Sequence, residues 1–161
     1  MTARRIHLAV VGGSEADDTT CRRAEAVGEA LARRGAVLVC GGLGGVMEAA
    51  CRGAQAGGGT TLGILPGADR RAANPFVDVV VPTGMGEARN ALVVLCADAL
   101  VAVGGEFGTL SEIAFALKMG TPVVGLESWR LEREGMVGDP IQRAGTPSEA
   151  VARALGAAGP V

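Results

Sequence analysis

The segment from Asp98 to Lys118 constrains the fold more than any other stretch of the sequence. It begins with a short valine-rich run, 99–103, which is typical of a strand buried on both faces. Glycines follow, and apolar residues then recur at the spacing of a helix. A strand that passes through a glycine turn into a helix predicts an anion site. Glycine lets backbone amides approach a ligand, and the helix dipole favours negative charge at the N-terminus.

Glu112 lies one turn into this expected helix, close to the amides of the expected anion site. A carboxylate beside an anion is electrostatically unfavourable, and placements that break a local rule are typical of functional sites. Thr109 and Glu112 also have the spacing of a capping box, in which the two side chains satisfy free amides at a helix start. The sequence leaves the functional and the capping interpretation open.

Strands and helices are expected to alternate along the whole chain. The expected strands are 6–11, 36–40, 60–65, 77–81, 99–103 and 123–126, with a short edge strand at 141–143. The expected helices are 18–34, 46–56, 87–96, the helix that ends near Lys118, and a last helix that Thr146 caps. This order predicts an α/β fold, a Rossmann-like three-layer sandwich with a mainly parallel sheet of six to seven strands. The length suits one domain over residues 1–161.

In such a fold a ligand binds at the carboxyl ends of the strands, near the topological switch point. The sequence has 26 glycines in 161 residues, roughly twice the usual share, and three clusters directly follow apolar runs. These turns are 12–14, 41–45 and 104–108, and we expect them to meet at that edge. The expected phosphate- or nucleotide-binding residues are Gly12, Gly13, Ser14, Gly41, Gly42, Gly44, Gly45, Met85, Asn90, Gly104, Gly105, Phe107, Gly108 and Thr109.

The common nucleotide motifs are absent from the sequence. A P-loop needs a lysine after its second glycine, but Lys118 is the only lysine and lies elsewhere. The dinucleotide fingerprint begins at Gly42 and fails at Met47, which occupies the place of the third glycine. Cys40 stands where an acid would bind a ribose. A smaller phosphorylated ligand is therefore expected in place of NAD, FAD or a nucleoside triphosphate.

Composition argues against several other classes of protein. The net charge is −2 with no basic stripe, which disfavours nucleic-acid binding. His7 is the only histidine, so we expect no metal site, and the four cysteines (21, 40, 51 and 96) are expected to be reduced core residues. The longest apolar tract, 91–103, is broken by Asp98 and is too short to span a membrane. A cytoplasmic protein without membrane contact is expected.

Arg89 interrupts an otherwise apolar stretch, so it either faces a cleft or is a solvated arginine on a helix surface. The sequence Gly-Glu-Ala-Arg-Asn at 86–90, followed by Gly-Gly-Glu-Phe-Gly-Thr-Leu-Ser-Glu at 104–112, resembles the LOG (Lonely Guy) family, long misannotated as lysine decarboxylases. That family has an Arg-Lys pair and then Pro-Gly-Gly-x-Gly-Thr-x-x-Glu. The glycine turn 41–47 is similar too, and the resemblance covers roughly residues 6–126.

Two residues depart from the LOG pattern. Asn90 stands where the cytokinin-activating enzymes have lysine, and Val103 replaces the proline before the glycines. The sequence of these segments is more similar to a LOG-like bacterial branch that includes molybdenum cofactor carrier proteins. These departures question the cytokinin substrate and leave the expected fold and anion site unchanged.

For the enzymes, the resemblance implies hydrolysis of a nucleoside 5′-monophosphate to free base and ribose 5-phosphate, with no cofactor required. It implies that Glu112 is the catalytic carboxylate beside an oxocarbenium-like state, and that Arg89 orients the ribose or the base. Amides of Gly105, Gly108 and Thr109 would hold the phosphate. Stacking candidates are few, and Phe107 is the best of them.

The alternative that the resemblance implies is a binding protein that holds the molybdenum cofactor, or another phosphorylated ligand, without turnover. Glu112 and Arg89 favour the enzyme, whereas Asn90 favours the carrier branch. The family also implies a homodimer or homotetramer. The expected helices 46–56 and 87–96 have little polar face, which is consistent with a surface that finds a partner.

Overall fold

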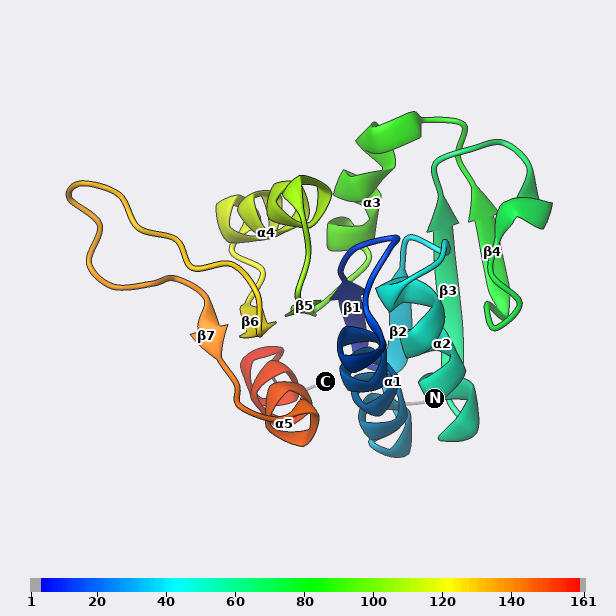
Figure 1. Cartoon of the computed structure of the whole chain (residues 1–161), viewed down its shortest axis with the longest axis horizontal. Coiled ribbons are helices and arrows are strands. Elements are labelled where there is room, and N and C mark those ends of the chain that lie inside the picture. Colours follow the sequence, from blue (N-terminus) through cyan, green and yellow to red (C-terminus); the bar gives the residue numbers. More distant parts are fainter. Residues whose placement is uncertain (1–3, 160–161) are drawn as a thin grey trace.

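The computed structural model describes residues 4–159, so the expected domain 1–161 extends past the described residues at both ends. Seven strands form one sheet, in which every pair is parallel (Figure 1). The strands are β1 (His7–Val11), β2 (Val37–Cys40), β3 (Thr60–Leu65), β4 (Val79–Pro82), β5 (Ala99–Val103), β6 (Val123–Leu126) and β7 (Gln142–Arg143). The helices are α1 (Asp18–Arg33), α2 (Val46–Ala56), α3 (Asn90–Leu95), α4 (Phe107–Met119) and α5 (Pro147–Ala157). Two 3₁₀ turns, η1 (Arg70–Ala72) and η2 (Gly86–Arg89), complete the described elements.

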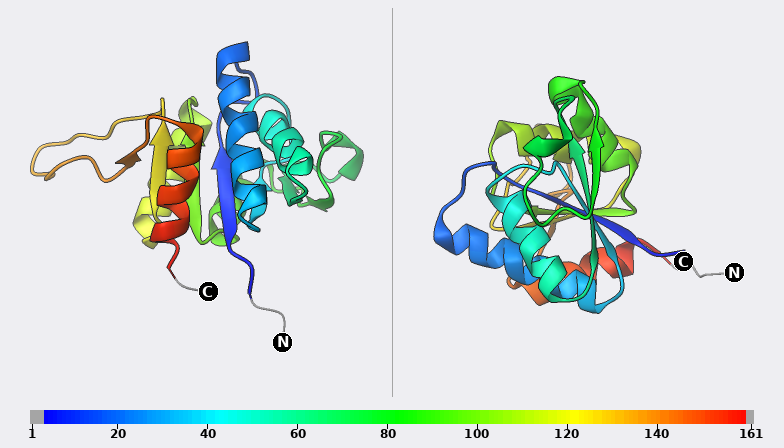
Figure 2. Two further views of the ribbon diagram at one scale, coloured as in Figure 1. Left: turned by 90° about the horizontal axis from the view of Figure 1, so that it is seen from below. Right: turned by 90° about the vertical axis from the view of Figure 1, so that its right-hand side faces the viewer.

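Helices cover both faces of the sheet, which confirms the predicted α/β sandwich. Helices α1, α2 and α5 lie side by side on one face, and α3 and α4 lie on the other (Figures 1 and 2). All five residues of β5 are buried, as the valine-rich run predicts, because helices pack on both sides of it. The central strands are thus enclosed between two helical layers, whereas the edge strand β4 is mostly exposed.

The strand order β4-β3-β2-β1-β5-β6-β7 defines the position of the switch point. From β1 the chain moves outwards to β4, then returns to form β5 on the other side of β1. Val11 at the end of β1 is in register with Ala102 near the end of β5, so the turns after both strands begin at the same level. A crevice is expected there, because the two connections leave to opposite faces of the sheet.

Helices α1 and α2 cross at two glycines. A Cβ at Gly28 would lie 2.0 Å from the Ala50 oxygen, and one at Gly53 would lie 1.9 Å from the Glu25 oxygen. The apolar side of α2 is therefore covered by α1 within the same chain. This corrects the expectation that helix 46–56 presents an apolar face to a partner.

Several boundaries differ from the sequence-based expectation. The helix expected at 87–96 is split into the 3₁₀ turn η2 and the short helix α3, with Arg89 at the junction. The strand expected at 77–81 begins at Val79, and the edge strand at 141–143 is two residues long. The cap predicted for α5 is confirmed, because the Glu149 amide donates to Thr146 Oγ1 over 3.2 Å.

The cysteines and His7 are placed largely as expected. Cys40 and Cys51 are buried with their Sγ atoms 3.5 Å apart and no disulfide between them. Cys96 is exposed at the end of α3, so it is not a core residue. A ring nitrogen of His7 contacts the Cys96 carbonyl oxygen at 3.1 Å, which gives this histidine a structural role. Within residues 4–159, no helix has the length and apolar character needed to cross a membrane.

Candidate functional site

A cavity of about 330 Å³ lies at the switch point, bounded by the turns that follow β1 and β2, by η2 and by the start of α4. Its lining residues are Gly12, Gly13, Ser14, Glu15, Leu43, Met47, Glu87, Arg89, Asn90, Glu106, Gly108, Thr109 and Glu112. The volume lies at the lower end of the range for small-molecule sites. Eight of the residues expected from the sequence lie in this wall: Gly12, Gly13, Ser14, Arg89, Asn90, Gly108, Thr109 and Glu112.

The N-terminus of α4 opens into this cavity without a side-chain cap. Its first backbone hydrogen bond runs from the Leu110 amide to the Glu106 oxygen over 3.0 Å, and no side chain of the described residues caps the helix. The amides of Phe107, Gly108 and Thr109 therefore have no partner within the helix. Gly108 and Thr109 line the cavity, so these amides and the helix dipole can bind an anion there.

The helix start also tests the capping interpretation of Glu112. The N-cap residue of α4 is Glu106, and Thr109 is the third residue of the helix, so the capping-box interpretation is wrong. Glu112 is only 8% exposed and lines the cavity, and neither of its carboxyl oxygens is fully buried without a hydrogen-bond partner. Burial raises the pKa of Glu112 to about 7, against the opposing charge of Arg89 and with a smaller contribution from Glu87. A buried carboxyl group with this pKa can donate or accept a proton near neutral pH.

Arg89 is buried, not solvated, and most of its donors are already engaged. Its Nη1 donates to the carbonyl oxygens of Gly41 and Ile64, and its Nε donates to Asn90 Oδ1 over 2.8 Å. Among the described residues only Nη2 lacks a partner, so the guanidinium has a single nitrogen left for a ligand. Burial lowers the pKa of Arg89, and the nearby charges of Glu112 and Glu87 oppose this.

Asn90 connects the arginine to α4. Besides accepting from Arg89, its Nδ2 lies 3.4 Å from Ser111 Oγ and 3.5 Å from Glu87 Oε2. A lysine at this position, as in the LOG enzymes, has no oxygen to accept the Arg89 Nε–H. Asparagine in place of the family's lysine at position 90 is therefore consistent with an Arg89 side chain that hydrogen bonds hold in one orientation.

The glycines after β1 and β2 let two turns approach each other closely. A Cβ at Gly12 would lie 2.5 Å from Val46 Cγ1, and one at Gly45, whose φ is +60°, would lie 2.3 Å from the Gly13 oxygen. The Val46 amide donates to this same Gly13 oxygen over 3.0 Å. The turn after β1 is thus joined to the start of α2, and Gly44 lies beside Ser14.

The other residues expected from the sequence lie near the cavity but outside its wall. Gly41 contacts Arg89, and Gly42 (φ +75°) packs on Leu65. Gly104 and Gly105 line a second, smaller hollow on the α1 side of the crevice. Phe107 is 76% exposed and packs against Trp129 in a tilted arrangement with ring centroids 5.7 Å apart, and it is not among the lining residues. Met85 is half exposed, just before η2.

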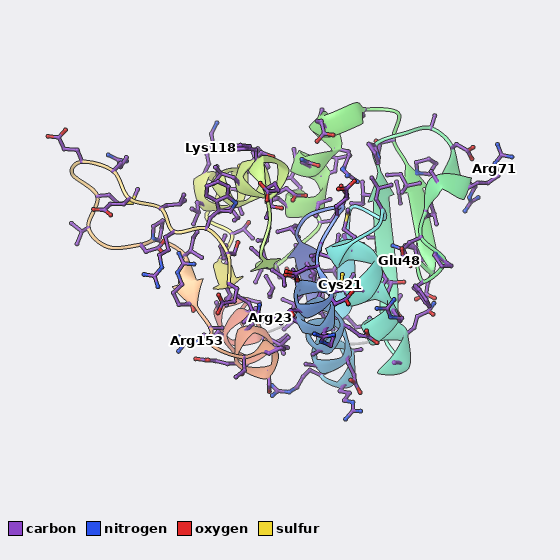
Figure 3. The ribbon with its side chains drawn as sticks, in the orientation of Figure 1. Cys21, Arg23, Glu48, Arg71, Lys118 and Arg153 are labelled. Carbon is purple, nitrogen blue, oxygen red and sulfur yellow. The ribbon has the colours of Figure 1, made fainter. Side chains whose placement is uncertain are left out.

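Sequence reasoning missed five lining residues: Glu15, Leu43, Met47, Glu87 and Glu106. Met47, which breaks the dinucleotide fingerprint and ends the 41–47 turn, lies in the wall, and its sulfur would lie 2.8 Å from a Cβ at Gly41. The position of Glu15 directly after the first glycine turn was an available signal. Arg89 is the only basic residue in the wall, and the single lysine, Lys118, lies in the last turn of α4 (Figure 3).

No group of three or more His, Cys, Asp or Glu side chains within residues 4–159 is arranged to hold a metal ion. The polar groups that can meet a ligand are the α4 amides, the glutamates and the Nη2 of Arg89. The amides and Nη2 can donate to an anionic group, and the carboxylates can accept from N–H groups.

The parallel sheet and the glycine turns around its switch-point cavity define a Rossmann-like α/β protein. Within this class the chain belongs to the SLOG cluster4 family, whose sequence model matches residues 5–154. The family match confirms the LOG-like resemblance. The chain is also 48% identical over 122 residues to an uncharacterized protein of Archaeoglobus fulgidus, which covers 76% of this chain and 80% of that protein.

Two solved structures are similar over nearly the whole chain. The molybdenum cofactor binding protein of the phototrophic bacterium Rippkaea orientalis superposes with a TM-score of 0.87 at 34% identity, covering 96% of this chain and 98% of that one. The Moco carrier protein of Chlamydomonas reinhardtii superposes with a TM-score of 0.81 at 34% identity, with the same coverage. Both neighbours are molybdenum cofactor binding or carrier proteins, which is consistent with the LOG-like branch suggested by the sequence.

Proposed function

We propose that this protein binds a phosphorylated pterin, the molybdenum cofactor or a close relative, in the switch-point cavity and holds it without turnover. The observation that carries the proposal is the uncapped N-terminus of α4, whose free amides open into a cavity that Glu112, only 8% exposed, also lines. The amides of Gly108 and Thr109 would bind the phosphate of the ligand. Leu43 and Met47 would form an apolar wall for its ring.

The similarity to the Rippkaea and Chlamydomonas proteins supports the carrier over the enzyme. The hydrogen bonds that Arg89 already makes also support the carrier function. Two nitrogens of its guanidinium are hydrogen-bonded to the protein, so a bidentate contact with a substrate would require breaking a bond already made. An arginine held this way serves to keep the wall rigid.

The proposal is tested by loading the purified protein with the molybdenum cofactor. Purified protein is mixed with molybdenum cofactor released from a donor enzyme under anaerobic conditions and passed through a desalting column. Molybdenum is then measured by mass spectrometry and the pterin by fluorescence after oxidation. We expect about one equivalent of each to stay with the protein, and Gly108→Asp, which places a carboxylate before the free amides, to abolish retention. A protein that elutes without metal or pterin contradicts the proposal.

A second function is favoured by one observation, the pKa of about 7 that burial gives Glu112. A carboxyl group poised near neutral pH suits hydrolysis of the N-glycosidic bond of a nucleoside 5′-monophosphate. Incubation with AMP and related monophosphates distinguishes the two functions. Release of free base and ribose 5-phosphate, lost in Glu112→Gln, supports the hydrolase, whereas retention of ligand without product supports the carrier.

We also propose a homo-oligomer in the cytoplasm. Large apolar side chains are exposed on α3 and α4, with Leu95 at 58% and Met119 at 52%, and this surface suits contact with a second copy. Cys40 and Cys51 in contact without a disulfide suit a reducing compartment. Light scattering after gel filtration tests the assembly, and a monomeric mass contradicts it.

A further inference from the structure

The charge of the cavity wall does not match a ligand that is only an anion. Four lining residues are glutamates, Glu15, Glu87, Glu106 and Glu112, against the single arginine Arg89. An ionised carboxylate is only an acceptor of hydrogen bonds. Glu106 and Glu112 lie at the start of α4, whereas Glu15 and Glu87 add acceptors to the wall away from the α4 amides. This part of the wall suits a ligand whose far end carries N–H groups.

Glu112 presents a carboxyl group of low exposure to this cavity. It is 8% exposed and lines the wall, and neither of its oxygens is fully buried without a hydrogen-bond partner, so the carboxyl group can meet a ligand in the cavity. Glu112 lies one turn from the amides of Gly108 and Thr109, and its raised pKa lets the protonated carboxyl group donate to the anionic end of the ligand.

The contact between η2 and the turn after β2 indicates where the ring of the ligand would lie. Arg89 on η2 donates to the Gly41 oxygen, and a Cβ at Gly41 would lie 2.6 Å from Arg89 Nη1 and 2.8 Å from Met47 Sδ. The apolar wall of Leu43 and Met47 therefore lies beside η2. Glu87 is the glutamate on η2, and its closest hydrogen-bond partner among the described residues is the Asn90 amide at 3.5 Å.

We propose that the cavity selects a ring with two adjacent N–H donors, the 2-amino-4-oxopyrimidine edge shared by pterins and guanine, and that Glu87 accepts both donors. A carboxylate matches such an edge with two parallel hydrogen bonds. Adenine lacks this pair of donors, and hypoxanthine differs from guanine only in lacking the 2-amino group. The inference rests on the proposed binding of a phosphorylated ligand and names the ring that this site prefers.

The test is calorimetric titration of the full chain with GMP, IMP, AMP and inorganic phosphate. We expect GMP to bind about tenfold more tightly than IMP, because hydrogen bonds to a charged group are among the strong ones. In Glu87→Gln the carboxamide offers one acceptor oxygen and one NH2 donor, so it cannot form two parallel hydrogen bonds to two N–H donors, and GMP and IMP should bind with about equal affinity. Affinity for inorganic phosphate should be the same in this variant as in the original protein.

Two control variants distinguish recognition of the ring from recognition of the phosphate. Glu106→Gln removes a negative charge at the N-cap of α4, so GMP and IMP should both bind more tightly and their ratio should stay unchanged. Glu134→Gln, at an exposed position outside the cavity, should change neither affinity nor ratio.

The outcomes distinguish this inference from the function on which it rests. Equal affinity for GMP and IMP overturns the inference and leaves phosphate binding in place. A GMP preference that survives in Glu87→Gln overturns the assignment of Glu87. If the protein takes up neither the nucleotides nor phosphate, both proposals are wrong. Circular dichroism of each variant verifies that it is folded.

Discussion

Arg89 and Gly41 are in direct contact, because Nη1 of the arginine donates to the glycine's carbonyl oxygen. The contact leaves no room for a side chain, since a Cβ at position 41 would lie 2.6 Å from Nη1. It joins η2 to the end of β2 and so fixes one wall of the cavity. The glycine after β2 is therefore required by an arginine on another element.

Gly41→Ala is expected to displace Arg89 and to cost about 1–3 kcal/mol of the free energy of unfolding, the usual cost of overpacking a close contact. Ligand affinity should fall with it, because the wall that carries Arg89 moves. Urea denaturation and titration with GMP measure the two effects. Gly67→Ala is the matched control, since no atom lies within 4 Å of its Cβ position. A Gly41→Ala protein as stable as this control would contradict the proposed contact.

Asn90→Leu is expected to destabilise the protein by about 2 kcal/mol, because it leaves Nε of a buried guanidinium without an acceptor. Asn90→Asp keeps an oxygen in place and should be tolerated. Thermal or urea unfolding of the two variants measures the difference. If Asn90→Leu and Asn90→Asp unfold alike, the hydrogen bond from Arg89 contributes nothing measurable.

The fold could be predicted because its signals are local. Each buried strand is a short apolar run, and glycine turns mark the carboxyl ends that meet at the switch point. Dependence on local signals also explains why the capping box predicted at Thr109 and Glu112 was wrong. The Thr109-to-Glu112 spacing fits a helix start, but the chain is already helical from Phe107, and nothing in that short pattern locates the start.

The remaining site residues depend on contacts between distant segments. Arg89 reaches carbonyl groups 48 and 25 residues away, and its burial follows from the break between η2 and α3, which apolar periodicity does not reveal. Glu87 and Glu106 look like ordinary surface charges in the sequence. Only the folded chain brings them to one cavity.

Glu112 makes stability depend on pH in an unusual direction. Burial raises its pKa to about 7 from the value of 4.5 that it has when unfolded. Between these two pH values the folded state binds more protons than the unfolded state, so this group's contribution to stability is greatest below pH 4.5 and is lost as pH rises to 7. The loss amounts to roughly 3 kcal/mol.

Glu112→Gln is expected to remove this pH dependence and to be more stable than the original protein at pH 8. Urea denaturation at pH 5 and pH 8 measures the effect, and Glu134→Gln, an exposed position, is the control that should keep the original slope. Glu112→Gln with an unchanged slope would mean that the carboxyl group at 112 titrates normally.

Substitution of the two threonines near helix starts, Thr146 and Thr109, should distinguish a capping role from a ligand-binding role. Thr146 caps α5, so Thr146→Val is expected to cost about 1 kcal/mol of stability and to leave phosphate affinity unchanged. Thr109 is the third residue of α4 and lines the cavity. Thr109→Val keeps its shape and removes only the hydroxyl group, so stability should change little while phosphate affinity falls by about fivefold. Titration with inorganic phosphate and urea denaturation of both variants give the comparison. A loss of stability in Thr109→Val equal to that in Thr146→Val, with phosphate binding intact, would make Thr109 a structural residue and remove its hydroxyl from the anion site.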